Sequence, residues 1–106
     1  MGIRFVYITT NNEEEAARIG KELVVHRLAA CANIIKGLRS FYWWEGEVQD
    51  DSEALLIAKT REELMPQLIH KVKELHTYTC PCIVSLPIME GNPDFLQWIV
   101  QETSEG

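Results

Sequence analysis

The sequence predicts an α+β fold: an antiparallel four-stranded sheet with two helices on one face, followed by a further helix at the C-terminus. The segments 6–10 (VYITT) and 56–60 (LIAKT) each read as the end of a strand that leads into an acid-rich helix start and then another strand. Two such βαβ units in tandem, with right-handed crossovers, interleave into one sheet, the ferredoxin-like arrangement. The 106 residues have the usual size of one domain, so we expect residues 1–106 to form a single domain of this fold.

The N-terminal half supplies the first strand, a helix and the second strand. Residues 3–9 are β-branched and aromatic and nearly all apolar, which is typical of a strand covered on both faces. Polar residues and three glutamates at 13–15 mark a helix start, and apolar residues spaced by three and four continue the helix. A second strand is expected at 29–35, with a bulge at Gly37 and renewed pairing at 40–44.

The middle of the chain reads as a hairpin followed by a helix start. Glu45-Gly46 predicts a tight turn between two strands. The polar residues 49–52 are expected to kink the returning chain before a third strand at 54–59. Thr-Arg-Glu-Glu at 60–63 predicts a capping box at the start of the second helix.

The C-terminal part begins with that second helix, in which Pro66 falls early enough to be tolerated. A loop at 76–81 and a fourth strand at 82–88 follow. Asn92 and Pro93 predict the cap and the first residue of a last helix. We expect its apolar face to consist of Phe95, Trp98 and Ile99. Residues 103–106 are expected to form a frayed tail.

The charge and composition exclude two classes of function. Lys and Arg number 10 against 16 Asp and Glu, a net charge of -6, and no basic cluster stands out, so nucleic-acid binding is not expected. No apolar run approaches the ~20 residues of a membrane span, so no membrane partner is expected. The start does not read as a secretion signal, so we expect a cytoplasmic protein whose three cysteines are free thiols.

The apolar residues of the strands predict self-association. Trp43 and Trp44 are adjacent in a strand and therefore point to opposite faces. A 12.2 kDa monomer has little with which to cover both faces of such a sheet. We therefore expect a homo-oligomer that buries the second sheet face or the edge of the hairpin, with the aromatic residues 41–44 packed at the interface.

The stretch His76, Cys80 and Cys82 is a candidate metal site. Imidazole and thiolates suit Cu(I) or Zn(II), and in an extended strand the two cysteines point to the same side. The alternative is that both cysteines are small core residues, because apolar residues at 84, 86 and 88 continue that face.

Lys59 suggests a second kind of site. It ends a strand just before a helix N-terminus, where a cation and free amide groups could hold an anion. Together with Tyr78, His76 and Trp44, Lys59 is a candidate to line a cleft between subunits. The alternative is a structural ion pair of Lys59 with Glu53 or another acid.

An ordered set of motifs runs from about Val6 to Trp98, nearly the whole chain. The motifs are RLAACANII at 27–35, YWWEG at 42–46, DSE at 51–53, Lys59-Thr60, Leu75-His76, Tyr78, Pro81 and Gly91-Asn92. In this combination the chain resembles the divalent-cation tolerance proteins of the CutA family. The resemblance implies a ferredoxin-like tight homotrimer, similar in architecture to PII-type nitrogen signalling proteins. It also implies a cytoplasmic, non-enzymatic protein linked to tolerance of copper and other divalent ions, with no required cofactor.

The chain departs from the family pattern near the candidate metal site. The family commonly reads His-Pro-Tyr-acid-x-Pro-Glu where residues 76–82 here read HTYTCPC. The departures are Thr77, Thr79 and Cys82. In some bacterial members, copper has been placed near a first-strand cysteine and a pair of histidines. The matching positions here are Thr9, Leu75 and His76, so only His76 is retained.

Three hypotheses follow. The first is a non-enzymatic homotrimer that responds to metal ions, copper among them, by weak binding, and it predicts metal effects that vanish without His76 or Cys82. The second is a PII-like signalling module that binds a small anion or metabolite, and it predicts ligand stabilisation lost in Lys59→Ala. The third is a purely structural trimer, which predicts neither effect.

Overall fold

The computed structural model describes residues 2–104 and confirms the α+β fold class. Its elements are, in chain order, β1 (Ile3–Thr10), α1 (Glu13–Val25), β2 (Cys31–Trp44), β3 (Glu47–Arg61), the 3-10 turn η1 (Glu62–Leu64), α2 (Met65–Leu75), β4 (Ile83–Pro87) and α3 (Pro93–Glu102). The four strands form one sheet in the order β2-β3-β1-β4, and every neighbouring pair is antiparallel.

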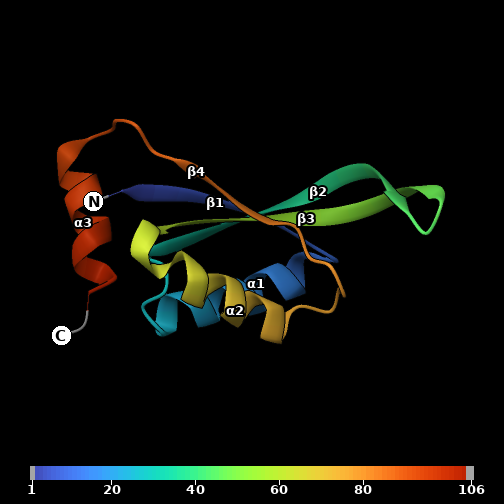
Figure 1. Ribbon diagram of the computed structural model, residues 1–106, viewed down its shortest axis with the longest axis horizontal. Helices are drawn as coiled ribbons and strands as arrows, with labels where there is room; N and C mark the ends of the chain where they lie inside the picture. Colours follow the sequence, from blue (N-terminus) through green and yellow to red (C-terminus); the bar gives the residue numbers. More distant parts are fainter. Residues whose placement is uncertain (1, 105–106) are drawn as a thin grey trace.

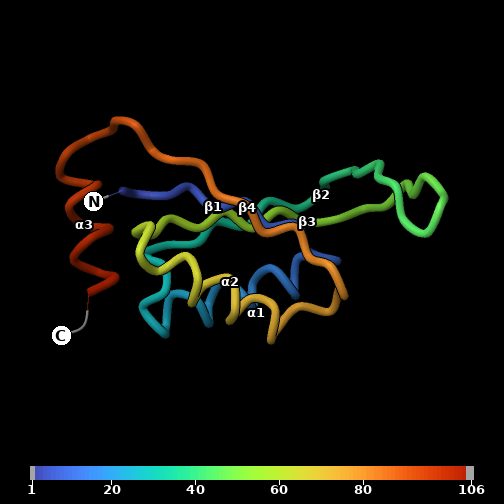
Figure 2. The backbone as a smooth tube through the Cα atoms, in the orientation of Figure 1, coloured from blue at the N-terminus to red at the C-terminus, as the bar shows by residue number. Residues whose placement is uncertain are grey.

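The sheet has one covered face and one bare face. Helices α1 and α2 lie side by side against one face, while α3 stands at the end of the sheet near the N-terminus (Figure 1). The paired strands β2 and β3 run on past the helices as a long two-stranded arm, which the backbone trace in Figure 2 shows projecting from the body. The molecule is correspondingly elongated, 44 × 26 × 21 Å. Side chains on the arm and on the uncovered face therefore have no protein layer above them.

The core fills the space between the sheet and the two helices. Its largest fully buried members are Val6, Ile8, Ile19, Leu23, Leu56, Leu68 and Val72. Each such side chain contributes about 1.5–3 kcal/mol through removal of apolar surface from water. Gly20 allows α1 to come close to the sheet, because a Cβ there would lie only 2.9 Å from Leu56 Cδ1.

The start of α1 is capped as its sequence predicts. The Asn12 side chain accepts a hydrogen bond from the Glu15 N–H at 2.8 Å, which satisfies one free amide of the first turn. At the start of α3, Asn92 accepts from the Asp94 N–H at 3.1 Å, and Pro93 is the first helical residue. Both helix starts were therefore predictable from local sequence.

The hairpin differs from the prediction in one respect. Its bulge lies at Gly37, with φ of 84°, and its turn at Glu45 and Gly46, both with positive φ, as expected. The predicted kink at 49–52 is wrong, because these residues continue β3 without interruption. On a two-stranded arm both faces meet water, so polar residues are compatible with a regular strand. Arg39 holds this register through two hydrogen bonds to Asp50, of 3.0 and 2.9 Å.

The predicted capping box at 60–63 is also wrong. Thr60 is fully buried as the last core-facing residue of β3, and its hydroxyl has no partner among the described residues. The 3-10 turn begins after Arg61, whose side chain makes no capping hydrogen bond. The Glu62 N–H is satisfied instead by the carbonyl of Gly2 at 2.8 Å. Tertiary pairing therefore supplies the acceptor that the local motif was expected to provide.

The C-terminal helix is anchored more firmly than predicted. Ile99 is fully buried, but Phe95 and Trp98 are part-exposed and stack on each other with ring centroids 5.6 Å apart. Thr103, expected in a frayed tail, is buried and receives hydrogen bonds from the Arg61 guanidinium on its Oγ1 at 2.9 Å and its carbonyl at 2.8 Å. Residues 105–106 of the predicted tail lie outside the described residues.

Candidate functional site

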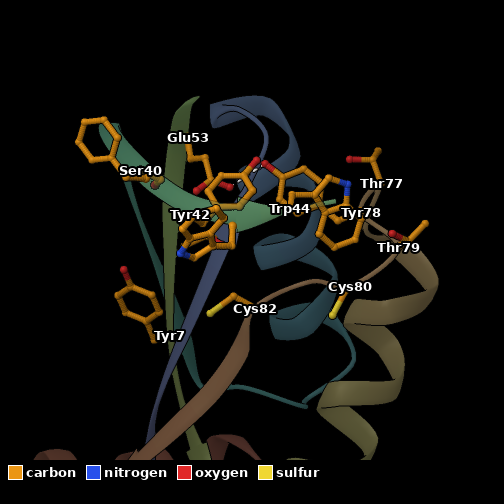
Figure 3. Close-up of a pocket in the computed structure, with 13 residues that line it drawn as sticks. Tyr7, Ser40, Tyr42, Trp44, Glu53, Thr77, Tyr78, Thr79, Cys80 and Cys82 are labelled. Carbon is orange, nitrogen blue, oxygen red and sulfur yellow. Dashed lines mark hydrogen bonds between the residues drawn. The ribbon is translucent and has the colours of Figure 1, made fainter. Parts of the chain in front are cut away.

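A cavity of about 700 Å³ lies where the bare sheet face meets the base of the hairpin arm. Strands β1, β2 and β3 supply one wall and the loop 77–82 supplies the other, as the close-up shows (Figure 3). Strand alternation decides which residues face it. In β1 the buried Val6, Ile8 and Thr10 point to the helices, so Tyr7 and Thr9 point to the cavity.

Glu53 and Tyr78 join the two walls. The Tyr78 hydroxyl donates a hydrogen bond to Glu53 Oε2 at 2.7 Å, and Glu53 is only 7% exposed. Burial, followed by the bond to the Glu53 carboxylate, raises the pKa of the Tyr78 phenol above its ordinary value. Tyr78 therefore stays protonated and acts as a donor at neutral pH.

A second phenol–carboxylate pair lies on the arm beside the first. The Tyr42 hydroxyl donates to Asp51 Oδ2, and this bond raises the pKa of Tyr42 to about 12. Asp51 and Glu53 are two residues apart on β3, so they share a face of the strand. Two neutral phenols thus line the cavity, together with the Glu53 carboxylate, while Asp51 lies outside its lining.

Both ring nitrogens of His76 are hydrogen-bonded within the protein. One ring nitrogen, Nε2, lies 2.8 Å from the Thr9 carbonyl oxygen, and the other, Nδ1, lies 3.1 Å from the Tyr78 N–H. A carbonyl only accepts and an amide N–H only donates, so these contacts assign Nε2 as the donor and Nδ1 as the acceptor. The side chain has no exposed surface. His76 has no free nitrogen for a metal ion in this arrangement and instead positions the loop.

The Glu15 carboxylate holds the loop 77–82 in place. It accepts hydrogen bonds from the Asn11 N–H at 2.8 Å and the Thr77 N–H at 2.9 Å. Burial alone would raise the pKa of Glu15. The hydrogen bonds to its carboxylate, with the one from Asn11 contributing most, more than offset burial and hold the pKa below its ordinary value. Sequence reasoning missed this role, although the Asn-x-x-Glu spacing of residues 12–15 marked Glu15 as a first-turn acid.

The two candidate thiols are exposed and line the cavity. Cys80 and Cys82 flank Pro81 in the loop and just before β4. The expectation that they belong to the core is wrong, because Val84 and Leu86 on the same strand face are 53% and 61% exposed. Within residues 2–104, no three His, Cys, Asp or Glu side chains are grouped to share a metal ion. The structure therefore does not bring His76 together with the two cysteines as one ligand set.

Lys59 lies elsewhere on the bare face. Its ammonium donates to Asn33 Oδ1 at 2.9 Å and lies 4.0 Å from Cys31 Sγ. Glu53 is six residues away on the same strand, about 20 Å at ~3.3 Å per residue, so the alternative ion pair does not form. Trp44 and Tyr78 do line the cavity, as expected, but Lys59 is not among its lining residues.

The helices of residues 2–104 lack the combined length and apolarity that crossing a membrane requires.

The chain matches known proteins along nearly its whole length. A family model described as CutA1 divalent ion tolerance protein covers residues 4–102. A Thermus thermophilus protein named divalent-cation tolerance protein CutA is 52% identical over 98 residues, which cover 92% of this chain and 95% of that protein.

Solved structures agree with this match. The crystal structure of CutA1 from Oryza sativa superposes with a TM-score of 0.95 at 43% identity and covers 100% of this chain and 97% of that one. The structure described as the periplasmic divalent cation tolerance protein CutA from Archaeoglobus fulgidus gives 0.93 at 43% identity, over 96% and 99% of the two chains. The resemblance seen in the sequence motifs is confirmed, and the chain belongs to the CutA1 divalent ion tolerance family.

Proposed function

We propose that the protein serves divalent-cation tolerance as a homotrimer that weakly binds a soft metal ion, copper first, through Cys80 and Cys82. The family supports the metal hypothesis, since its relatives are named for divalent-cation tolerance. The proposal assigns no catalytic step and no required cofactor to the chain, and it treats residues 1–106 as one domain. It keeps the cytoplasmic location expected from the sequence, although the Archaeoglobus fulgidus relative is described as periplasmic.

The observation that carries the proposal is the pair of exposed thiols lining one cavity. Cys80 and Cys82 are separated only by Pro81, and both reach the cavity surface. Sulfur ligands favour Cu(I) and Zn(II) over hard ions such as Mg(II). Two thiols leave such an ion open to further ligands, which fits weak binding better than a closed structural site. His76 is left out of this ligand pair because both its nitrogens are hydrogen-bonded.

Self-association is supported by the apolar surface that the protomer leaves uncovered. On the arm, Phe41 and Trp43 are 65% and 74% exposed, and on β4 Leu86 is 61% exposed. Large apolar side chains left exposed in this way are typical of interaction sites. Because the thiols open onto the same bare face, a second copy packed there could complete the coordination of the ion.

The anion hypothesis finds less support. Its cation, Lys59, is hydrogen-bonded to Asn33 and lies outside the cavity. Among the described lining residues there is no Lys, Arg or His to attract an anion. The purely structural trimer remains the outcome to expect if no metal binds.

The test is a calorimetric titration of the reduced, metal-free protein with Cu(I) and Zn(II) under anaerobic conditions. We expect binding near one ion per subunit, at least about tenfold weaker in Cys80→Ser and in Cys82→Ser. The matched control is Cys31→Ser, which removes the thiol beside Lys59 and should leave the titration unchanged. Wild-type binding no tighter than roughly millimolar, about -4 kcal/mol, would contradict the proposal.

A further inference from the structure

We propose that the cavity between the hairpin arm and the loop 77–82 binds a small organic ammonium cation, held by aromatic ring faces and by the Glu53 carboxylate. This site uses different side chains and a different ligand class from the thiol pair. Its ligand is a cation, whereas the hypothesis based on Lys59 expected an anion in the cleft.

The charge of the cavity is the first argument. Glu53 is the one ionisable carboxyl group among its described lining residues, and no cationic side chain accompanies it. Glu53 is 7% exposed, and its Oε2 accepts from Tyr78. No other hydrogen bond within residues 2–104 reaches this carboxylate, so Oε1 is free to meet a ligand. A part-buried carboxylate without a cation attracts positive charge, and the net charge of -6 strengthens that field.

The aromatic lining is the second argument. Tyr7, Tyr42, Trp44 and Tyr78 all line the cavity, from β1, the arm and the loop (Figure 3). A ring face attracts a cation through its quadrupole, and recognition of substituted ammonium groups by several aromatic faces is a recurring solution. At Glu53, away from the thiols, an inorganic divalent ion is not the expected ligand, because a single carboxylate would replace few of its water ligands.

Two of the four rings, those of Tyr78 and Tyr42, are held in place before any ligand arrives. The Tyr78 hydroxyl is fixed by Glu53, and the Tyr42 hydroxyl is fixed by Asp51. His76 supports the Tyr78 ring from one side, with centroids 4.7 Å apart. Little side-chain freedom is left to lose on binding, which favours affinity. A cavity of about 700 Å³ has room for an alkylated ammonium and its attached chain, far more than a metal ion needs.

The test uses choline as the probe and the full chain in the assembly that it forms in solution. Binding is followed by tryptophan fluorescence, in the presence of a chelator so that metal plays no part. We expect saturable binding of choline. Its uncharged carbon isostere, 3,3-dimethylbutan-1-ol, should bind about tenfold more weakly, and inorganic phosphate should not bind.

The variant test removes the charge of Glu53 and keeps its shape. Glu53→Gln should weaken choline binding by roughly 3- to 30-fold, the range expected for a desolvated cation contact. Glu47→Gln makes the same charge change on the same strand, outside the cavity, and should leave binding unchanged. Circular dichroism and sedimentation of both variants show whether fold and assembly are kept.

Three results would overturn the proposal. They are no saturable choline binding by the wild type, equal binding of the uncharged isostere, and equal losses in the two variants. If choline fails to bind and Glu53→Gln changes the assembly, the cavity is filled by a cationic side chain of a neighbouring copy instead. A failed metal titration has no bearing on these outcomes, because the choline experiment contains no metal.

Discussion

Single side chains decide how the cavity is built, and Glu15 is the clearest case. This carboxylate accepts hydrogen bonds from the N–H groups of Asn11, which lies between β1 and α1, and of Thr77 in the loop 77–82. The contact with Thr77 is not visible in the local sequence, because Glu15 and Thr77 are 62 positions apart. A residue that reads as an ordinary first-turn acid therefore fixes the loop that carries Tyr78.

Glu15 should make the stability of the protein depend on pH in a defined direction. Its folded-state pKa lies below the ordinary 4.5, so its contribution is fully present above that pH and is lost as the pH falls through the folded value. Glu15→Gln should lower the free energy of unfolding by about 1–3 kcal/mol at pH 7. The difference from wild type should shrink below pH 4.5, measured by urea unfolding at several pH values.

The control is Glu14→Gln, an exposed acid in the same turn with the same effect on the helix dipole. It should change stability by less than about 0.5 kcal/mol. If Glu14→Gln and Glu15→Gln lower the free energy of unfolding by the same amount and with the same pH dependence, the Glu15 carboxylate does not stabilise the loop.

Whole elements were predictable where their signals are local. The caps at Asn12 and Asn92, the bulge at Gly37 and the turn at Glu45-Gly46 all form as expected. The kink expected at 49–52 did not form, because strand pairing with β2 outweighs the low strand propensity of these residues. The capping signal of Thr60 was overridden in the same way, since β3 extends through it.

The hairpin turn offers a test at this scale. Glu45 and Gly46 have φ of 51° and 80°, a backbone region that favours Gly and Asn over Glu. Glu45→Asn should stabilise the arm by up to about 1 kcal/mol, and Gly46→Ala should destabilise it by a similar amount. Hydrogen exchange of the arm amides measures both changes.

Glu47→Asn serves as the control, because it places the same residue at an extended position of β3. It should not stabilise the arm. Faster exchange in Glu45→Asn than in wild type would show that backbone strain at position 45 does not limit the turn.

The whole molecule is a two-layer structure with an uncovered second face. Helices α1 and α2 cover one side of the sheet (Figure 1), and α3 covers the other only at one end, where Ile99 packs against Ile3. That face and the arm carry the large exposed apolar residues, which a monomer in water would not stabilise. This imbalance between the two faces is the observation that supports self-association.

Leu86→Lys tests the assembly. Leu86 on β4 and Val25 at the end of α1 are 61% and 60% exposed in the protomer. In a monomer, Leu86→Lys and the control Val25→Lys should each lower the free energy of unfolding by less than about 0.5 kcal/mol. In the proposed trimer, only Leu86→Lys should shift the sedimentation pattern toward smaller species. The prediction fails if wild type sediments at 12.2 kDa, or if Leu86→Lys assembles as fully as Val25→Lys.

The sequence by itself determined the fold class, the order of the elements and the family, because periodicity, caps, turns and ordered motifs are local properties of the chain. It also named Trp44, Tyr78, Cys80 and Cys82, which the structure places on one cavity. Only the tertiary structure decided that His76 is hydrogen-bonded at both nitrogens, that Lys59 lies away from the cavity, and that Glu53 gives the cavity its charge. Most of these outcomes depend on contacts between residues far apart in the sequence, 67 positions for His76 and Thr9 and 25 for Tyr78 and Glu53, and such hydrogen-bond partners exist only after folding.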